Sequence, residues 1–121
     1  MNFEFNNDIP IYIQLVEQLK IHIISGNILP GDRLPSVREL ALSTKVNPNT
    51  MQKALVELEN LKLIYTERTN GKFVTNDKEL INKLRNEYAK EISEKYFSCM
   101  EKIGFGKKDA INYLKGLGGE K

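Results

Sequence analysis

The chain has 121 residues, of which 40% are hydrophobic and 28% charged, an ordinary composition for one soluble domain with a short appendage. This length allows a modest core and excludes a large catalytic cavity. The net charge is only +2, and residues 1–75 carry eight basic and eight acidic side chains, which excludes a generic polycation. Any binding of nucleic acid must therefore rest on cations that are placed locally.

The location of the protein is predicted by exclusion. Cys99 is the only cysteine, which rules out an intramolecular disulfide and fits a reducing cytoplasm. Residues 1–9 lack the basic start and apolar run of a signal peptide, and no apolar run approaches the roughly 20 residues that span a bilayer. We therefore expect a cytoplasmic protein without membrane contact.

The first predicted helix covers about residues 10–25. Asp8 and Pro10 indicate its start, because aspartate caps helices and proline is tolerated in the first turn. Apolar residues then recur at helical spacing up to Ile23, and Gly26 is the expected helix stop. His22, the only histidine, falls at the edge of the expected core, where a structural role is the common one.

The next segment predicts a helix-turn-helix. Ser36 and Glu39 form an S-x-x-E capping box, which opens a short helix that ends near Ser43. After a connector of four residues, Asn47 as cap and Pro48 at the first position open another helix. Two helices joined by so short a turn, the second polar at its start, are typical of this DNA-binding motif.

A β-hairpin is expected directly after the second of these helices. Residues 63–67 and 72–75 are short β-prone runs, and the residues between them end in Asn70 and Gly71. Asn-Gly between strands is a strong hairpin signal, since both residues tolerate positive φ. A hairpin in this position is a wing, so residues 1–75 are predicted to form a winged helix-turn-helix domain.

From Asn76 onward the pattern predicts only helices: one of about 27 residues, capped by Asn76 and closed by Gly104, and a second over about 107–117. The long helix carries an apolar stripe, near which Cys99 is expected to be buried. Pairing with the same helix of a second chain would cover the stripe; an intrachain cover helix is the alternative. Residues 76–121 are thus predicted to be a two-helix dimerisation module, with these residues near the seam: Leu84, Tyr88, Ile92, Tyr96 and Met100.

The candidate DNA-binding face combines the start of the second helix of the motif with neighbouring cations. Asparagine and glutamine bond base edges or phosphates, threonine does either, and lysine and arginine neutralise phosphates. The candidates are Ser36, Arg38, Asn47, Asn49, Thr50, Gln52, Lys53, Arg68, Gly71 and Lys72. The plain alternatives are a solvated, well-capped helix, a surface arginine at position 38 and a hairpin kept soluble by its charges.

Two other classes of function fit the sequence less well. A winged-helix module used only for protein contacts predicts an apolar exposed face on the second helix of the motif, whereas that face is polar. An enzyme needs a nucleophile with its base, a metal cluster or a phosphate loop, and one histidine and one cysteine do not supply these. We expect no enzymatic activity, no metal and no cofactor.

The segments 34–41, 46–55 and 68–74, together with Pro10-Ile11-Tyr12 and Pro30-Gly31-Asp32, closely resemble the GntR family of bacterial regulators. The resemblance covers about residues 9–76. The Asn-Pro-Asn-Thr helix start and the short tail look like the YtrA-like subfamily. The sequence departs from better-known members, which often carry arginine where this chain has Pro48 and Gln52, and glycine where it has Lys45.

The resemblance implies a function for the whole chain. It implies that Arg38, the start of the second helix of the motif and the wing glycine Gly71 touch an operator, and that the C-terminal helices serve dimerisation without a large ligand-binding domain. It suggests a repressor of a transporter operon. We expect a homodimer on a palindromic operator in double-stranded DNA, nucleoid-associated when bound, with an unidentified small-molecule effector as a possible partner.

Overall fold

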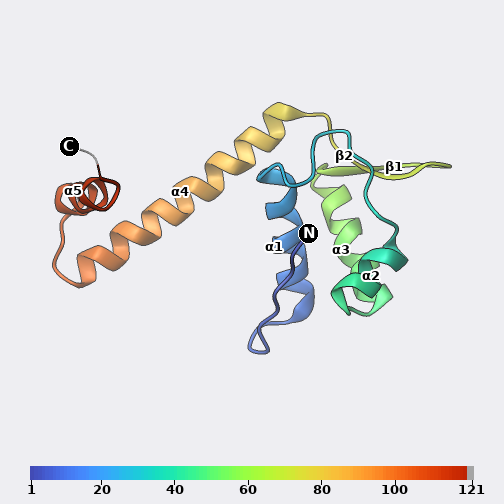
Figure 1. The fold of residues 1–121 in the computed structure, drawn as a ribbon, viewed down its shortest axis with the longest axis horizontal. Helices are drawn as coiled ribbons and strands as arrows, with labels where there is room; N and C mark the ends of the chain where they lie inside the picture. The colour runs from blue at the N-terminus through green and yellow to red at the C-terminus, as the bar shows by residue number, and fades with distance from the viewer. Residues whose placement is uncertain (120–121) are drawn as a thin grey trace. The chain divides into compact units, whose positions relative to one another are not determined.

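The structure is a computed structural model that describes residues 1–119. In this range the chain forms α1 (Ile11–Ile24), α2 (Val37–Thr44), α3 (Pro48–Asn60), β1 (Ile64–Glu67), β2 (Gly71–Val74), α4 (Lys78–Lys102) and α5 (Lys107–Leu117). The two strands pair antiparallel (Figure 1). The prediction of a mainly helical chain with one small hairpin is confirmed. None of the helices in the described range has the length and apolar composition to cross a membrane.

The chain divides into two compact units, Met1–Leu84 and Arg85–Lys121, so that the division falls within α4. The first unit contains α1 to α3, the hairpin and the start of α4. The second contains the rest of α4 and α5. Each unit is described by itself below.

The core of the first unit is built around α3, which packs against α1, α2 and β1. Met51, Ala54, Leu55 and Leu58 repeat at helical spacing and are fully buried in one apolar cluster with side chains of α1 and β2. Ile81 of α4 is buried in the same cluster. The apolar stripe of α3 thus faces inward, which leaves its other face to solvent.

The N-terminal residues 2–6 form a strap along α1, beside which the N-terminus lies in Figure 1. Side chains of α1 bind the main chain of the strap: His22 Nε2 lies 2.8 Å from the carbonyl oxygen of Asn2, and the amides of Gln18 and Gln14 bond the main chain of Glu4 and Asn6. His22 is buried, and its Nδ1 lies 3.0 Å from Asn27 Nδ2. The histidine therefore has the structural role that the sequence indicated.

Two predicted helix caps were wrong. Asp8 does not cap α1: the N-cap is Pro10, which has no side-chain hydrogen bond to offer. At α4 the cap is Asp77 rather than Asn76, because the Asp77 carboxylate accepts the N–H of Leu80 at 3.0 Å. The Thr75 hydroxyl accepts the N–H of Asp77 and so fixes the turn one residue later than predicted.

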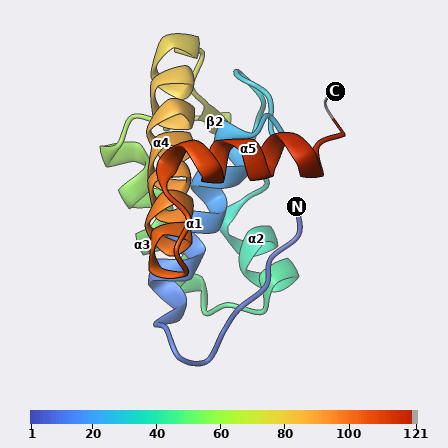
Figure 2. The same ribbon diagram turned by 90° about the vertical axis from the view of Figure 1, so that its left-hand side faces the viewer.

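In the second unit, α5 turns away from the line of α4 after Gly104 (Figure 2). The Tyr96 hydroxyl donates to the carbonyl oxygen of Ala110 at 2.7 Å, and Ala110 is fully buried. The Phe105 ring packs edge-on against Tyr113, and the Lys107 ammonium lies 5.3 Å from the centre of the Phe97 ring. These contacts join α4 to α5 within one chain. Cys99, which was expected to be buried, is exposed because it faces away from this small contact.

Candidate nucleic-acid interface

The start of α2 is fixed by the predicted capping box. The Ser36 hydroxyl accepts the N–H of Glu39 at 3.1 Å, and the Glu39 carboxylate accepts the N–H of Ser36 at 3.2 Å. The pKa of Glu39 is lowered, first by the Ser36 main-chain N–H and then by its hydroxyl. Ser36 is thus occupied within the protein. Arg38, one residue into the helix, is exposed and has no polar partner in residues 1–119.

The turn between α2 and α3 uses Lys45 where related motifs often have glycine. Lys45 adopts a left-handed conformation with φ 58°, and the N–H of Val46 donates back to the carbonyl oxygen of Ala41 at 3.1 Å. This bond closes the end of α2 in the manner usual for a helix that ends in a left-handed residue. Lysine therefore supports the turn that the motif requires, with the strain of a Cβ in this conformation.

The start of α3 carries most of the candidate residues. The Asn47 side chain caps the helix by accepting the N–H of Asn49 at 2.8 Å, and Pro48 occupies the first position, as predicted. The side chains of Asn49, Gln52 and Lys53 are exposed, Thr50 is half-buried, and none of these four has a side-chain partner in the described range. The first two turns of α3 thus present amide, hydroxyl and ammonium groups that the fold itself does not use.

The wing is a tight hairpin whose turn differs from the predicted one. Glu67 pairs with Gly71, so the loop has three residues, 68–70, and the N–H of Asn70 donates to the carbonyl oxygen of Glu67. Of Asn70 and Gly71, only Gly71 has positive φ, at 98°. Arg68 is exposed at the tip.

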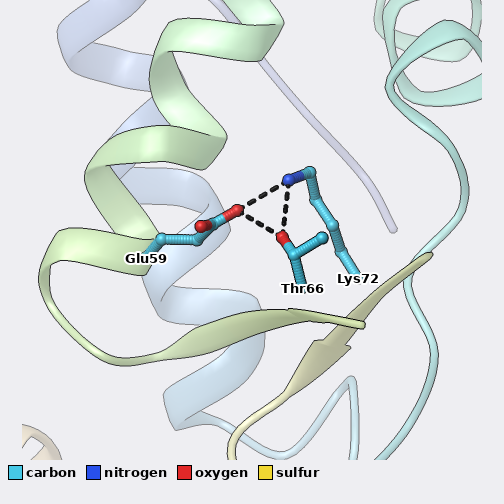
Figure 3. A network of polar contacts seen from close by, with 3 residues as sticks. All are labelled: Glu59, Thr66 and Lys72. Atoms are coloured by element: carbon cyan, nitrogen blue, oxygen red, sulfur yellow. Dashed lines mark hydrogen bonds and ion pairs between the residues drawn. The ribbon is translucent and has the colours of Figure 1, made fainter. Parts of the chain in front are cut away.

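Lys72 was predicted to contact DNA, and the structure gives its charge a partner inside the protein. Its ammonium group donates to Glu59 Oε1 at 2.6 Å and to the Thr66 hydroxyl at 2.9 Å, and that hydroxyl donates to the same carboxylate at 2.7 Å (Figure 3). The hydrogen bond from Lys72, followed by that from Thr66, lowers the pKa of Glu59. The network joins the last turn of α3 to both strands of the wing. The sequence did not reveal it, because the three residues belong to different elements.

Arg33 is a cation beside the wing that the sequence analysis did not select. It lies in the extended segment before α2, where it bridges Phe73 of β2. The N–H of the next residue, Leu34, donates to the carbonyl oxygen of Lys72 at 2.8 Å. The only signal in the sequence is a basic residue between the Pro30-Gly31 turn and Pro35, which does not indicate a partner.

The predicted dimerisation residues have different surroundings. Leu84 packs against the core of the first unit, Tyr88 and Met100 are half-buried, and Tyr96 is bonded to α5. Only Ile92 is largely exposed, at 67%. The predicted set does not include the apolar side chains that α5 and the turn before it expose, namely Ile103, Phe105, Ile111, Tyr113, Leu114 and Leu117.

The sequence pattern of the bacterial regulatory proteins of the gntR family matches residues 11–74. The chain belongs to the GntR family. The match covers α1 to the end of the hairpin, so the helix-turn-helix and the wing described above are those of a GntR-type DNA-binding domain.

Two relatives and one similar solved structure agree with this assignment. The chain is 36% identical over 115 residues to the HTH-type transcriptional regulator YhcF of Bacillus subtilis, with 95% of each chain covered. It is 47% identical over 66 residues to the HTH-type transcriptional repressor YtrA of the same organism, covering 54% of this chain and 51% of YtrA. A GntR family transcriptional regulator from Listeria monocytogenes superimposes with a TM-score of 0.85 at 43% identity, covering 93% of this chain and 98% of that one. The GntR protein described here is therefore a DNA-binding transcriptional regulator and not an enzyme.

Proposed function

We propose that this GntR protein recognises a specific operator with the first two turns of α3, aided by Arg38 and the tip of the wing. The observation that carries the proposal is the set of exposed, unpartnered groups on Asn49, Gln52 and Lys53 within the described range. An amide offers a paired donor and acceptor to a base edge, while an ammonium group neutralises a phosphate. Asn47 and Ser36 cap their helices and would act by holding the helix ends in place.

We also propose that the protein acts as a homodimer through residues 76–121. Support comes from the apolar side chains that the second unit leaves exposed, among them Ile92 at 67%, Leu114 at 47% and Leu117 at 71%. Such a surface on so small a unit favours a self-complementary contact. A two-fold dimer would carry two copies of α3 related by symmetry, which fits a palindromic operator.

The sign of regulation is proposed to be repression, and the subfamily to be YtrA-like. Similarity to the repressor YtrA, at 47% identity over 66 residues, supports both. A transporter operon as target, a small-molecule effector and residence in the cytoplasm remain part of this proposal.

The test is selection of bound sequences from a random DNA pool, followed by anisotropy measurements on the selected and on scrambled duplexes. We expect an inverted repeat bound by two chains per duplex, with the molar mass of the complex measured by light scattering. Salt-dependent binding to every duplex alike, with no enriched motif, would contradict sequence-specific recognition. Transcription in vitro from a promoter that carries the site should fall on addition of the protein; a rise would contradict repression.

Two neighbouring variants separate base reading from phosphate binding. Gln52→Ala should weaken binding to the selected site more than to scrambled DNA, because base contacts distinguish the two. Lys53→Ala should weaken both and should lower the salt slope by about 0.9 per lost phosphate contact. Equal losses on both duplexes for Gln52→Ala would contradict its role in reading bases.

A further inference from the structure

Three cations lie on or beside the wing, and they differ in what they bind. Lys72 is paired with Glu59 at 2.6 Å and is half-buried. Arg33 and Arg68 are exposed, and neither forms a hydrogen bond or ion pair within residues 1–119; the charge of Arg33 acts on Glu39 only at longer range, as the last of the causes that shift the pKa of that carboxyl. The positive charge available for an external ligand at this place is therefore carried by the two arginines.

The main chain holds Arg33 in a fixed position beside the wing. The bridge to Phe73 and the hydrogen bond from Leu34 to Lys72 place its segment along β2 like a short third strand. Just before Arg33 in the chain, the N–H of Gly31 donates to the carbonyl oxygen of Val74 at 2.9 Å. The N–H of Val74 in turn donates to the carbonyl oxygen of Asp32 at 2.8 Å. The start of the Arg33 side chain is thus fixed, whereas Arg68 lies at the exposed tip.

The guanidinium group of Arg33 lies against Gly71. A Cβ at position 71 would come within 3.2 Å of Arg33 Nε and 3.4 Å of Nη2, which is closer than ordinary contact allows without a shift. Gly71 therefore serves two purposes: it supplies the positive φ of 98° that the turn needs, and it leaves space for Arg33.

Between the segment 33–37 and the wing lies a groove, whose lining includes Arg33, Ser36, Glu67, Arg68, Thr69 and Gly71. Its only carboxylate, Glu67, accepts a hydrogen bond from Asn70 Nδ2 at 3.0 Å. Because Lys72 is paired with Glu59, the remaining charged side chains of the lining are Arg33, Arg68 and Glu67, and their net charge is positive. Val37, the first residue of α2, also lines the groove, and it is followed by the exposed Arg38.

We propose that Arg33 binds a phosphate of the DNA backbone in this groove, and that Gly71 leaves free the space that the Arg33 guanidinium occupies for this contact. The inference rests on DNA binding by the winged face. A guanidinium group suits the ligand, because its planar fork matches the oxygens of a phosphate and stays charged at every working pH. The contact positions the protein on the duplex and does not depend on the base sequence.

The test uses the full-length protein and a mixed-sequence duplex without a selected site, so that it does not depend on knowing the operator. Arg33→Ala should lower the slope of log K against log salt by about 0.9 per bound chain, which corresponds to about an eightfold loss of affinity at 0.1 M salt that vanishes near 1 M. Arg33→Lys should keep most of the slope. Lys83→Ala, which removes an exposed cation of α4 outside the groove, is the matched control and should keep the wild-type slope.

The outcomes separate this inference from the proposed function. Wild-type binding with an unchanged slope in Arg33→Ala would overturn the phosphate contact while leaving operator recognition intact. A slope that falls equally in Lys83→Ala would also overturn it, because the loss would then reflect net charge alone. If the wild type itself bound all DNA sequences alike, that result would count against the proposed function instead. Thermal unfolding of Arg33→Ala at the wild-type temperature would show that the loss of affinity is not a loss of fold.

A double-variant cycle tests the role of Gly71. Gly71→Ala should lower the slope by less than Arg33→Ala does, because its methyl group would shift the guanidinium by only a few tenths of an ångström and leave its charge in place. In the Arg33→Ala background, the same change should have no further effect on the slope, although the strain at positive φ persists in both backgrounds. Additive losses of slope would overturn the coupling between the two residues.

Discussion

The two units of this GntR protein bury their apolar side chains very unequally. Of the 18 apolar residues that are buried in the described range, 17 lie in the first unit and only Ala110 lies in the second. The second unit instead exposes apolar side chains along α5 and at Ile92. The first unit therefore has the core of an independent domain, whereas the second lacks the buried surface that so short a segment needs to be stable alone.

The largest expected effect comes from the core of the first unit. Leu55→Ala should lower the free energy of unfolding by about 2–5 kcal/mol, because Leu55 is fully buried and its truncation leaves a cavity. Urea unfolding followed by circular dichroism measures the loss. Leu42→Ala, the same truncation at an exposed position of α2, is the control. Equal losses in the two variants would contradict the unequal burial.

The second unit should fail in a different way, through association. Ile92→Asp should raise the dissociation constant of the proposed homodimer roughly 10-fold or more, since burial of an isoleucine contributes about 1.5–3 kcal/mol. Ser93→Asp adds the same charge at the neighbouring exposed position and should have a smaller effect. Sedimentation over a range of concentrations measures both constants. Identical constants for Ile92→Asp and the wild type would remove Ile92 from the interface.

A moderate effect is expected at the cap of α2. Ser36→Ala should cost about 1 kcal/mol, because the N–H of Glu39 loses its acceptor, and Ser36→Thr should recover most of the loss. The pKa of Glu39 should rise toward its ordinary value in the alanine variant, since the Ser36 hydroxyl contributes to lowering it. Carboxyl NMR titration measures this change. An unchanged pKa would show that the hydroxyl does not act on the carboxylate.

The smallest expected effect lies at the network that fastens the wing. Glu59→Gln should cost about 0.5–1 kcal/mol, because the ion pair with Lys72 is partly exposed and screened by water. Since the pKa of Glu59 is lowered in the folded state, the contribution is present above the usual value of 4.5 and is lost as the pH falls through the lowered pKa. The difference in stability between Glu59→Gln and the wild type should therefore shrink below about pH 4.5. A difference that persists at lower pH would contradict the ion pair as its cause.

Local signals in the sequence predicted how α2 and α3 begin. The capping box at Ser36 and the Asn47-Pro48 helix start were read correctly, because cap and acceptor lie within three residues of each other. The caps at Asp8 and Asn76 were misplaced where neighbouring residues offered competing local hydrogen bonds. At the wing, the Asn-Gly pair predicted a hairpin but not its three-residue loop.

Contacts between distant residues could not be predicted from the pattern. The pairing of Lys72 with Glu59 and the packing of Arg33 on Gly71 arise only when the wing folds back on α3 and on the segment before α2. Periodicity identifies buried faces, but it does not say which exposed cation meets which carboxylate. For this reason the pattern indicates Lys72 as a candidate DNA contact without its partner Glu59, and it does not indicate Arg33.

The strap at residues 2–6 has a consequence for how the sequence can drift over evolutionary time. Gln14 and Gln18 bond main-chain groups of the strap, which every residue type except proline possesses. Position 4 can therefore take any residue but proline, whereas the two glutamines on α1 cannot be replaced without leaving those groups unmatched. Phe3 and Phe5, which pack against the core, are the strap positions where the side chain itself matters. Among distant relatives, the strap should thus retain a pattern of alternate apolar residues and lose its sequence identity.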